Sequence, residues 1–246
     1  MSRSNPSADK QQSPVQRWLE WKGSKGHFEF YDKVKKEPFS IKPPFVFIVL
    51  DQTATIRGYN KRMKIGIYSN EVRDTRAETL VVKFFNGETI AEGFYTAIKE
   101  KAIAASGHFV TNCYMAFKDG NELKLGCIQF QGCSLGPWFE FVKNNREEIY
   151  KKAVCVKAGK LETSGSVQFY PPVFSINDLS AESDSKAKEV DAKLQEFLKG
   201  YFGRTRADQV STKPSQQYSD RVPPTGDEPP LTEPEGGDGE SSEVPF

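Results

Sequence analysis

The aromatic residues of this chain are confined to one continuous stretch, which limits where a folded core can form. Of the 30 aromatic residues, 28 lie between Trp18 and Phe202. A segment without large apolar side chains cannot offset the roughly 1–2 kcal/mol of backbone entropy that each ordered residue loses. We therefore expect three regions: a disordered N-terminus over residues 1–14, a folded body over residues 15–202, and a disordered Pro/Gly-rich acidic tail over residues 203–246.

The charges are also segregated, although their sum is close to zero. The chain has 34 Lys and Arg against 33 Asp and Glu, a net charge of +1. Residues 207–246 hold nine acids and two bases, a net charge of −7, which leaves 32 bases and 24 acids, a net charge of +8, in residues 1–206. A basic body suits a polyanionic ligand, and an acidic tail on the same chain can compete for the same surface.

Membrane and secretion signals are not visible in the sequence. The longest uncharged apolar run, Phe45 to Leu50, is six residues, far below the roughly 20 that cross a bilayer. The N-terminus has no apolar stretch of the secretory type. The four cysteines show no close pairing, which favours reduced thiols. We therefore expect a cytoplasmic protein without membrane contact, in the host cytoplasm if a phage encodes it. These cysteines are Cys113, Cys127, Cys133 and Cys155.

The hydrophobic pattern of the body predicts mostly strands. Asn86-Gly87 and Asp119-Gly120-Asn121 are typical hairpin turns. Thr89-Ile-Ala-Glu92 fits a capping box, so we expect a helix from this point to Gly107. A last helix is expected over about residues 184–201, with Leu194 and Leu198 on its apolar face. The expected strands are 45–50, 54–59, 65–68, 79–85, 108–118, 122–132, 153–157 and 166–174, with a short aromatic segment at 138–141.

This order of elements predicts a mainly β protein with some α-helix. Several strands, one inserted helix and a long hairpin follow one another as in the OB fold, a partly open five-stranded barrel that binds oligonucleotides or oligosaccharides. The fold class that we expect is therefore an OB-fold-like five-stranded antiparallel barrel with an inserted helix and a C-terminal helix. Other mixed antiparallel α+β layouts fit the same pattern.

Enzymatic chemistry is not expected, because catalytic residue patterns are missing. Only His27 and His108 could serve as bases near neutral pH, and no phosphate-binding loop or nucleophile elbow is present. Asp51 and Glu71 are isolated carboxylates, which we interpret as turn or surface residues. The cysteines are too widely spaced for a zinc knuckle and are expected to be buried thiols. We predict no catalytic residue, no metal and no cofactor.

The positive signal is a mixture of cations and aromatic rings in residues 14–76. These residues hold 13 Lys and Arg, seven acids and ten aromatics, and four of the cations surround one tyrosine between residues 57 and 64. Single-stranded DNA offers phosphates and unpaired bases, so cations with exposed rings suit it, each stacked base contributing about 1–3 kcal/mol. The candidate DNA-binding residues are Trp18, Trp21, Lys42, Arg57, Tyr59, Lys61, Arg62, Lys64, Tyr68 and Arg73.

Packing offers a competing explanation for many of the rings. The spacing of Trp18 and Trp21 would also dock an N-terminal helix. Phe28, Phe30 and Phe39 are better explained by packing than by stacking. Core positions are expected for Phe45, Phe47, Phe84, Phe94 and Trp138.

The tail ends in an apolar group that its own folding does not require. Residues 227–246 contain seven acids, no base and one aromatic residue, Phe246. A disordered acidic segment has no core to fill, so Val-Pro-Phe at its end is typical of a plug that docks in a partner's apolar pocket. The candidate partner-binding tip consists of Asp238, Glu240, Glu243, Val244, Pro245 and Phe246.

A basic, aromatic, OB-like body followed by a Pro/Gly-rich linker and an acidic tip ending in Pro-Phe resembles the single-stranded-DNA-binding proteins of bacteria and phages. In the bacterial family the tip is a run of Asp followed by Ile-Pro-Phe; here Val244 stands for the Ile, and Gly and Ser interrupt the acids. The closer similarity is to a divergent phage type. The resemblance implies that the tip recruits replication or recombination proteins, such as a polymerase, helicase or primase, nuclease or recombinase.

The sequence therefore predicts a protein that coats and protects single-stranded DNA in replication, recombination and repair. Two alternatives remain: a strand-annealing or recombination mediator, and a structural or assembly protein that binds no nucleic acid. RNA is a further possible ligand, and homo-oligomers are possible.

Overall fold

A computed structural model describes residues 13–32 and 35–204 of the chain. Three α-helices and thirteen strands are assigned in this part. The helices are α1 (Tyr95–Ala104), α2 (Leu135–Asn144) and α3 (Ala181–Phe202), and a short 3-10 turn, Gly132–Ser134, precedes α2. The strands are β1 (Arg17–Lys22), β2 (His27–Asp32), β3 (Glu37–Ile41), β4 (Phe45–Asn60), β5 (Ile65–Ser69), β6 (Leu80–Phe84), β7 (Thr89–Gly93), β8 (Gly107–Asp119), β9 (Glu122–Phe130), β10 (Ala153–Ala158), β11 (Glu162–Ser164), β12 (Val167–Phe169) and β13 (Pro172–Asn177).

The described strands confirm a mainly β class, but their pairing is not that of a five-stranded antiparallel barrel. Eleven of them form one mixed sheet in the order β3-β2-β1-β9-β8-β4-β5-β6-β7, with β10 and β13 branching from β4, while β11 and β12 form a separate pair. The sheet is open, and β1 runs parallel to β9. A parallel pair needs a long connection, which the chain between β1 and β9 provides.

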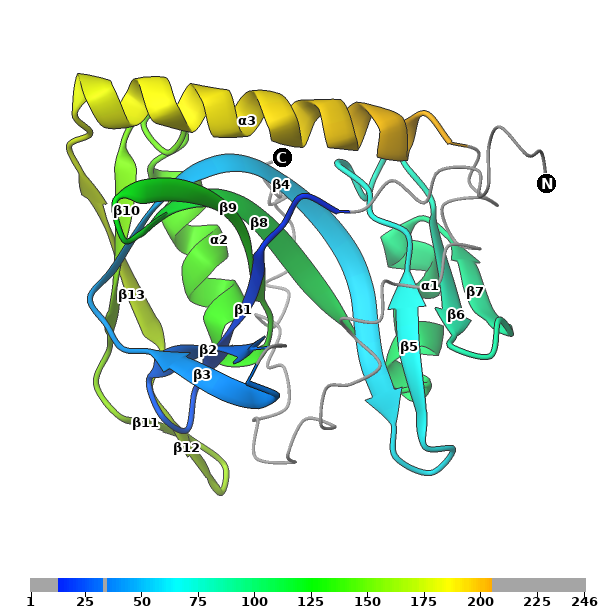
Figure 1. Ribbon diagram of the computed structural model, residues 1–246. Coiled ribbons are helices and arrows are strands. Elements are labelled where there is room, and N and C mark those ends of the chain that lie inside the picture. The colour runs from blue at the N-terminus through cyan, green and yellow to red at the C-terminus, as the bar shows by residue number, and fades with distance from the viewer. Residues whose placement is uncertain (1–12, 33–34, 205–246) are drawn as a thin grey trace.

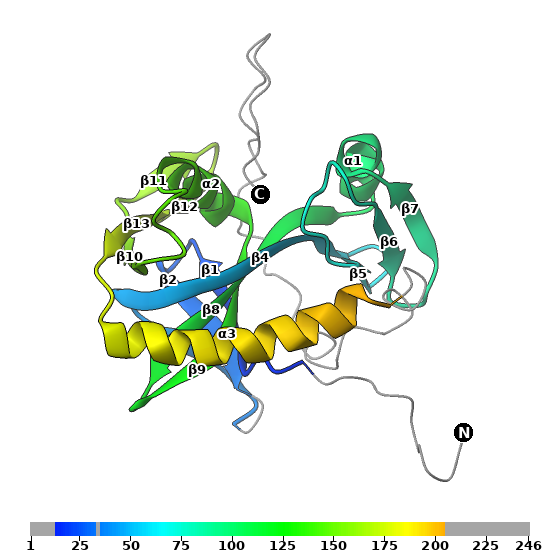
Figure 2. The same cartoon turned by 90° about the horizontal axis from the view of Figure 1, so that it is seen from above.

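The sixteen-residue strand β4 joins the two halves of the sheet. Its first residues pair with β10, its last residues pair with β5, and β8 accompanies it along nearly its whole length. The pairing with β8 shifts register between Val49 and Asp51, and such bulges bend a strand and increase its twist. Figure 1 shows β4 as an arch, and Figure 2 shows a lobe at each end of it.

Each lobe has its own apolar core. In one lobe, α2 packs against β1, β4, β8 and β9, and the fully buried ring of Trp138 stacks on Phe130 with centroids 4.3 Å apart. In the other lobe, α1 packs against β4, β5 and β6 around Ile56, Leu80 and Ile98. Leu135 and the ring of Phe139 contact both cores.

Helix α3 lies along the convex side of the β4 arch (Figure 1). The hydroxyl of Ser180 accepts a hydrogen bond from Ser183 N and caps its start. Its apolar face presents Leu194 and Leu198 to Trp18 and Tyr114. The expected C-terminal helix, residues 184–201, is confirmed with slightly wider bounds.

No helix among the described residues has the length and apolarity needed to cross a membrane.

Polar groups also fasten α3 to the sheet. The Glu71 carboxylate accepts hydrogen bonds from Thr53 Oγ1 at 2.6 Å and from Tyr114 Oη at 2.8 Å, and Glu71 N donates to Tyr201 Oη at 2.9 Å. Burial raises the pKa of both tyrosine hydroxyls, so both remain protonated near neutral pH. The interpretation of Glu71 as an isolated surface carboxylate is therefore wrong, because its partners come from segments that are distant in sequence.

The predicted start of the first helix is wrong. The Thr89–Glu92 capping box lies in β7, which pairs with β6, and α1 begins later at Tyr95. Strand pairing therefore decides a structure that the local pattern leaves open. The aromatic segment over residues 138–141, for which the sequence predicted no element, belongs to α2. By contrast, both predicted turns are confirmed, with Gly87 and Gly120 at positive φ.

Candidate nucleic-acid interface

The turn between β4 and β5 displays three cations, Lys61, Arg62 and Lys64, which we call the basic hairpin. All three side chains are exposed. Asn60 shapes the turn, because its Oδ1 accepts a hydrogen bond from Met63 N at 2.9 Å and its Nδ2 donates to Ala105 O at 3.0 Å. Within the described residues, no ion pair neutralises these three cations. The basic hairpin therefore presents a positive charge at a fixed place on the lobe of α1.

Beside the basic hairpin, a row of side chains crosses four strands. Arg57 on β4 lies opposite Tyr68 on β5 and opposite His108 on β8, and Tyr68 lies opposite Lys83 on β6. Directly opposed residues in antiparallel strands share one face of the sheet, so these four side chains form one cross-strand row. His108 is exposed by its surface area, but partial desolvation by the neighbouring protein still lowers its pKa. The imidazole is therefore neutral at pH 7, and Arg57 and Lys83 supply the positive charge of the row.

The two tyrosines expected to stack on bases differ in access. Tyr68 is buried, its ring meets that of Phe85 edge-on at 5.3 Å, and burial raises the pKa of its hydroxyl. Tyr59 is half-buried and lies opposite Gly66. Of the pair, Tyr59 has the more accessible ring, while Tyr68 forms part of the surface on which Arg57 and Lys83 lie.

Glycines permit the close approach of strands at this point. A Cβ atom at Gly58 would lie 1.9 Å from Ser106 O, which is shorter than any allowed contact. Gly58 lies opposite Gly107 at the end of the β4–β8 pairing. A side chain at residue 58 would push β8 away from β4 and disturb the row that begins one residue earlier.

The expectation that Trp18 and Trp21 stack on bases is not supported by their positions. Both lie on β1, not on an N-terminal helix. Trp18 is 8% exposed and meets Tyr114 edge-on at 6.3 Å beneath α3, while Trp21 is 2% exposed and donates from Nε1 to Tyr170 O at 2.8 Å. Their rings contribute to two different cores, because successive odd and even positions of a strand face opposite sides.

The side chain of Arg73 is also held by partners within the protein, and its charge is paired with a carboxylate. Its guanidinium lies 2.7 Å from Asp51 Oδ2 and 3.2 Å from Gln195 Oε1, and its Cζ lies 5.1 Å from the ring centroid of Phe202. These contacts tie the loop after β5 to α3. The interpretation of Asp51 as an isolated carboxylate is wrong for the same reason.

Lys42 is exposed but far along the sheet from the basic hairpin. It lies between β3 and β4, whereas Lys61 follows the other end of β4, and a sixteen-residue strand has a contour length of about 50 Å. Near Lys42, the ring of Phe39 is 43% exposed and lies 5.8 Å from Lys35 Nζ. The packing interpretation of Phe39 is thus only partly right, although the fully buried Phe28 confirms it for that residue.

The cysteine thiols are enclosed by the fold to different degrees. Cys113, Cys127 and Cys155 are buried, Cys133 is half-buried, and burial raises the thiol pKa of Cys113 and Cys127 well above the usual value. In residues 13–32 and 35–204, no group of three or more His, Cys, Asp or Glu side chains is arranged to hold a metal ion. The predicted tip residues, Asp238, Glu240, Glu243, Val244, Pro245 and Phe246, lie outside the described residues.

Comparison of the chain with known protein families, with curated proteins and with solved structures found no match in any of the three. The candidate site is therefore inferred only from the positions of its own residues. The sequence identified Arg57, Tyr59, Lys61, Arg62, Lys64 and Tyr68, which the structure brings together. It missed Lys83 and His108, since their positions beside Arg57 and Tyr68 depend on strand register.

Proposed function

We propose that this protein binds single-stranded DNA without catalysing a reaction, and that it coats and protects the strand during replication, recombination or repair. The basic hairpin carries the proposal, because three exposed cations lie beside a row that adds Arg57 and Lys83. Phosphates bind such cations and release counterions, and Tyr59 offers a ring for a base. The Lys35–Phe39–Lys42 surface is a second contact region on the other lobe.

The topology around the hairpin is compatible with a divergent OB-like unit. Strands β4, β5 and β6 form an antiparallel meander, α1 follows β7, and β8 and β9 form the long hairpin. We propose that these elements correspond to those of an OB fold in which β6 and β9 are not joined. The tail is proposed to recruit replication or recombination proteins through its tip, and the protein is proposed to act in the cytoplasm.

The direct test is the binding of labelled oligo(dT) at two salt concentrations, followed by fluorescence anisotropy. Intrinsic tryptophan fluorescence is a poor reporter, since Trp18, Trp21 and Trp138 are all buried. We expect log K to fall with log salt by about 0.7 per phosphate neutralised. A flat salt response or a preference for duplex DNA would contradict the proposal, and a preference for oligo(U) would favour RNA.

Truncation after Gly203 tests the role of the tail. The tail and the body carry net charges of opposite sign, so an attached tail competes with DNA at high effective concentration. We expect the truncated chain to bind oligo(dT) more tightly and to lose partner recruitment. Weaker DNA binding after truncation would refute this competition.

Two other functions give different results in simple assays. A strand-annealing mediator would accelerate the pairing of complementary oligonucleotides, which simple coating does not. A structural or assembly protein would fail to shift labelled oligo(dT) at low salt. The exposed, unneutralised basic hairpin favours the DNA-binding proposal over the latter.

A further inference from the structure

Three strands, β3, β7 and β13, end the pairing of the large sheet within the described residues. Sheet edges usually carry charged residues, which prevent unwanted pairing. β3 contains Glu37 and β7 contains Glu92. β13 has the sequence Pro-Val-Phe-Ser-Ile-Asn without any charge. Pro172 protects only the first position of this edge, so the rest of β13 is uncharged and suited to accept another extended segment.

The free hydrogen-bonding groups of β13 follow from its pairing with β10. Gly159 N donates to Pro171 O at 2.7 Å, so this directly opposed pair is a hydrogen-bonded one. Such pairs alternate with non-bonded pairs along antiparallel strands. Counting along β13, Phe174 and Ile176 fall on non-bonded pairs. Their N–H and C=O groups therefore point away from β10, toward the open edge.

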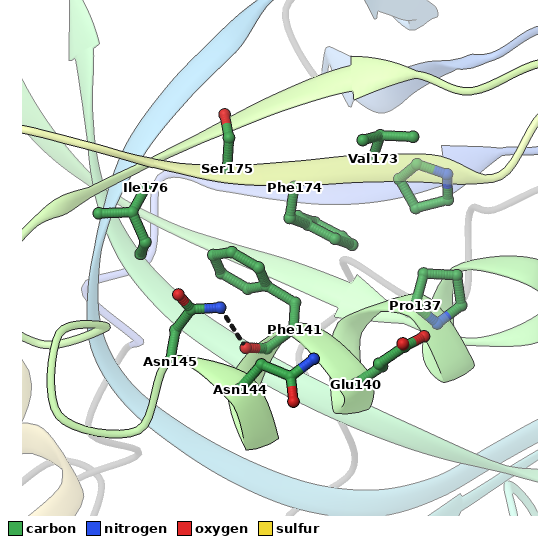
Figure 3. A pocket seen from close by; sticks show the side chains of 10 residues that line it. Pro137, Glu140, Phe141, Asn144, Asn145, Val173, Phe174, Ser175 and Ile176 are labelled. Carbon is green, nitrogen blue, oxygen red and sulfur yellow. Dashed lines mark hydrogen bonds between the residues drawn. The ribbon is translucent and has the colours of Figure 1, made fainter.

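A groove of about 430 Å³ lies between this edge and α2 (Figure 3). The rings of Phe141 and Phe174 form its apolar wall, with centroids 5.4 Å apart. Asn144, Glu140 and Ser175 contribute polar groups to its lining, and Asn145 Nδ2 donates to Phe141 O at 2.8 Å. The groove thus combines an unpaired strand edge with aromatic surface, as extended-peptide sites do.

The segment Val244-Pro245-Phe246 of the same chain fits these features. An added strand uses the N–H and C=O groups of alternate residues. Val244 has both groups, and Phe246 has an N–H and a terminal carboxylate that can accept, whereas Pro245, which lacks an N–H, falls at the position that faces away from β13. In antiparallel addition, Val244 opposite Ile176 places Phe246 opposite Phe174, beside the aromatic wall. Pro245 would then also prevent a further strand from adding.

The tail is long enough to reach the groove. β13 leads into the first turn of α3, and the tail follows the last turn, about 33 Å away for a 22-residue helix. The 42 residues after Arg204 give a root-mean-square span of about 35 Å if the linker is flexible. A flexible tether of this length holds its end at millimolar effective concentration, which favours docking within one chain.

We propose that Val244–Phe246 adds as a strand to the free edge of β13 in its own chain and places the Phe246 ring against Phe141 and Phe174. Docking there occupies the tip and withholds it from other proteins. This site lies on the lobe of α2, whereas the basic hairpin lies on the lobe of α1. The docking proposal does not depend on DNA binding. It can therefore be refuted while the proposed DNA-binding function stands.

The test uses the full chain with Phe246→Ala, which disables its own tip, and a labelled peptide of residues 239–246. Fluorescence anisotropy should detect peptide binding that weakens at least tenfold after adding Asn144→Glu, which repels Glu243, or Ile176→Pro, which removes an edge N–H. Asn121→Glu, the same change on the exposed β8–β9 turn, is the matched control and should have no effect. Circular dichroism checks that the Ile176→Pro variant is folded. If it is unfolded, the result for Asn144→Glu decides the test.

Further measurements distinguish docking of the tip within one chain from docking between two chains. The unmodified chain should bind the labelled peptide at least tenfold more weakly than the Phe246→Ala chain, because its own tip competes. Equal binding by both chains, or equal binding by the groove variants and the control, would overturn the proposal. A concentration-dependent dimer that Phe246→Ala abolishes would overturn the assignment to the same chain. Parallel titrations with oligo(dT) report on the proposed function separately.

Discussion

Two hairpins of the central sheet carry cations, and they use them differently. At the β8–β9 hairpin, Arg17 Nη2 and Lys124 Nζ lie 2.8 Å and 2.9 Å from Asp119 Oδ2, and the Arg17 guanidinium also lies over the rings of Phe30 and Phe117. The basic hairpin between β4 and β5 has no such acid among the described residues. The number of cations alone therefore does not identify a polyanion site; what matters is whether the fold neutralises them.

The largest expected effect comes from removing the cations of the basic hairpin. Lys61→Ala, Arg62→Ala and Lys64→Asn together should weaken oligo(dT) binding about 100-fold at 0.1 M salt and reduce the salt slope by about 2, because roughly three phosphates are no longer neutralised. Asn suits residue 64 because its φ is 52°. Lys124→Ala at the neutralised hairpin is the control. If both variants bind alike, the comparison between the hairpins is wrong.

A second prediction concerns Glu71, whose carboxylate accepts its hydrogen bonds from within the protein. Glu71→Ala removes the acceptor of Thr53 and Tyr114 and leaves two buried hydroxyls without this partner. We expect a loss of about 2–3 kcal/mol, which lowers Tm by roughly 5–10 °C for a body of this size. Thermal unfolding measures the change, and oligo(dT) affinity at 20 °C should stay the same. An unchanged Tm would show that Glu71 does not fasten α3.

A third prediction separates two arginines that the sequence treats alike. Arg57→Ala should weaken oligo(dT) binding about fivefold at 0.1 M salt, the effect of one phosphate contact. Arg73→Ala should leave DNA binding unchanged and slightly lower Tm, because its guanidinium contacts Asp51, Gln195 and Phe202. The opposite pattern in anisotropy titrations would place the DNA at Arg73, next to α3, and not at the row of Arg57.

The smallest effect is the pH dependence of the neutralised hairpin. The hydrogen bond from Lys124, with the charge of Arg17, lowers the pKa of Asp119. Its contribution to stability is therefore present above the unfolded-state pKa and is lost as pH falls through the folded-state value. The difference in Tm between the native chain and Asp119→Asn should shrink from pH 6 to pH 3, and the corresponding free energy should stay below about 1 kcal/mol, since the pair is partly exposed. A difference that grows toward low pH would contradict this sign.

Much of the site was predictable where the information is local. Lys61, Arg62 and Lys64 stand between two apolar strands, and a polar turn between strands is exposed whatever the rest of the chain does. The Asp119-Gly120-Asn121 turn is similarly local, because the left-handed conformation of Gly120 favours it. Trp18 and Arg73 were misjudged, since the partners that bury or neutralise them, Tyr114 and Asp51, are separated from them by 96 and 22 residues.

The sequence by itself determined which part of the chain carries the aromatic residues, its mainly β character, the two tight turns, the amphipathic helix over about residues 184–201 and the exposed cations at residues 61–64. These properties depend on composition and on side chains a few residues apart. The tertiary structure decided that Glu71 fastens α3, that Lys83 lies in the same cross-strand row as Arg57 with His108 opposite Arg57, and that β13 ends the pairing of the sheet within the described residues. Those features depend on strand register and helix docking, which bring distant residues within hydrogen-bonding distance.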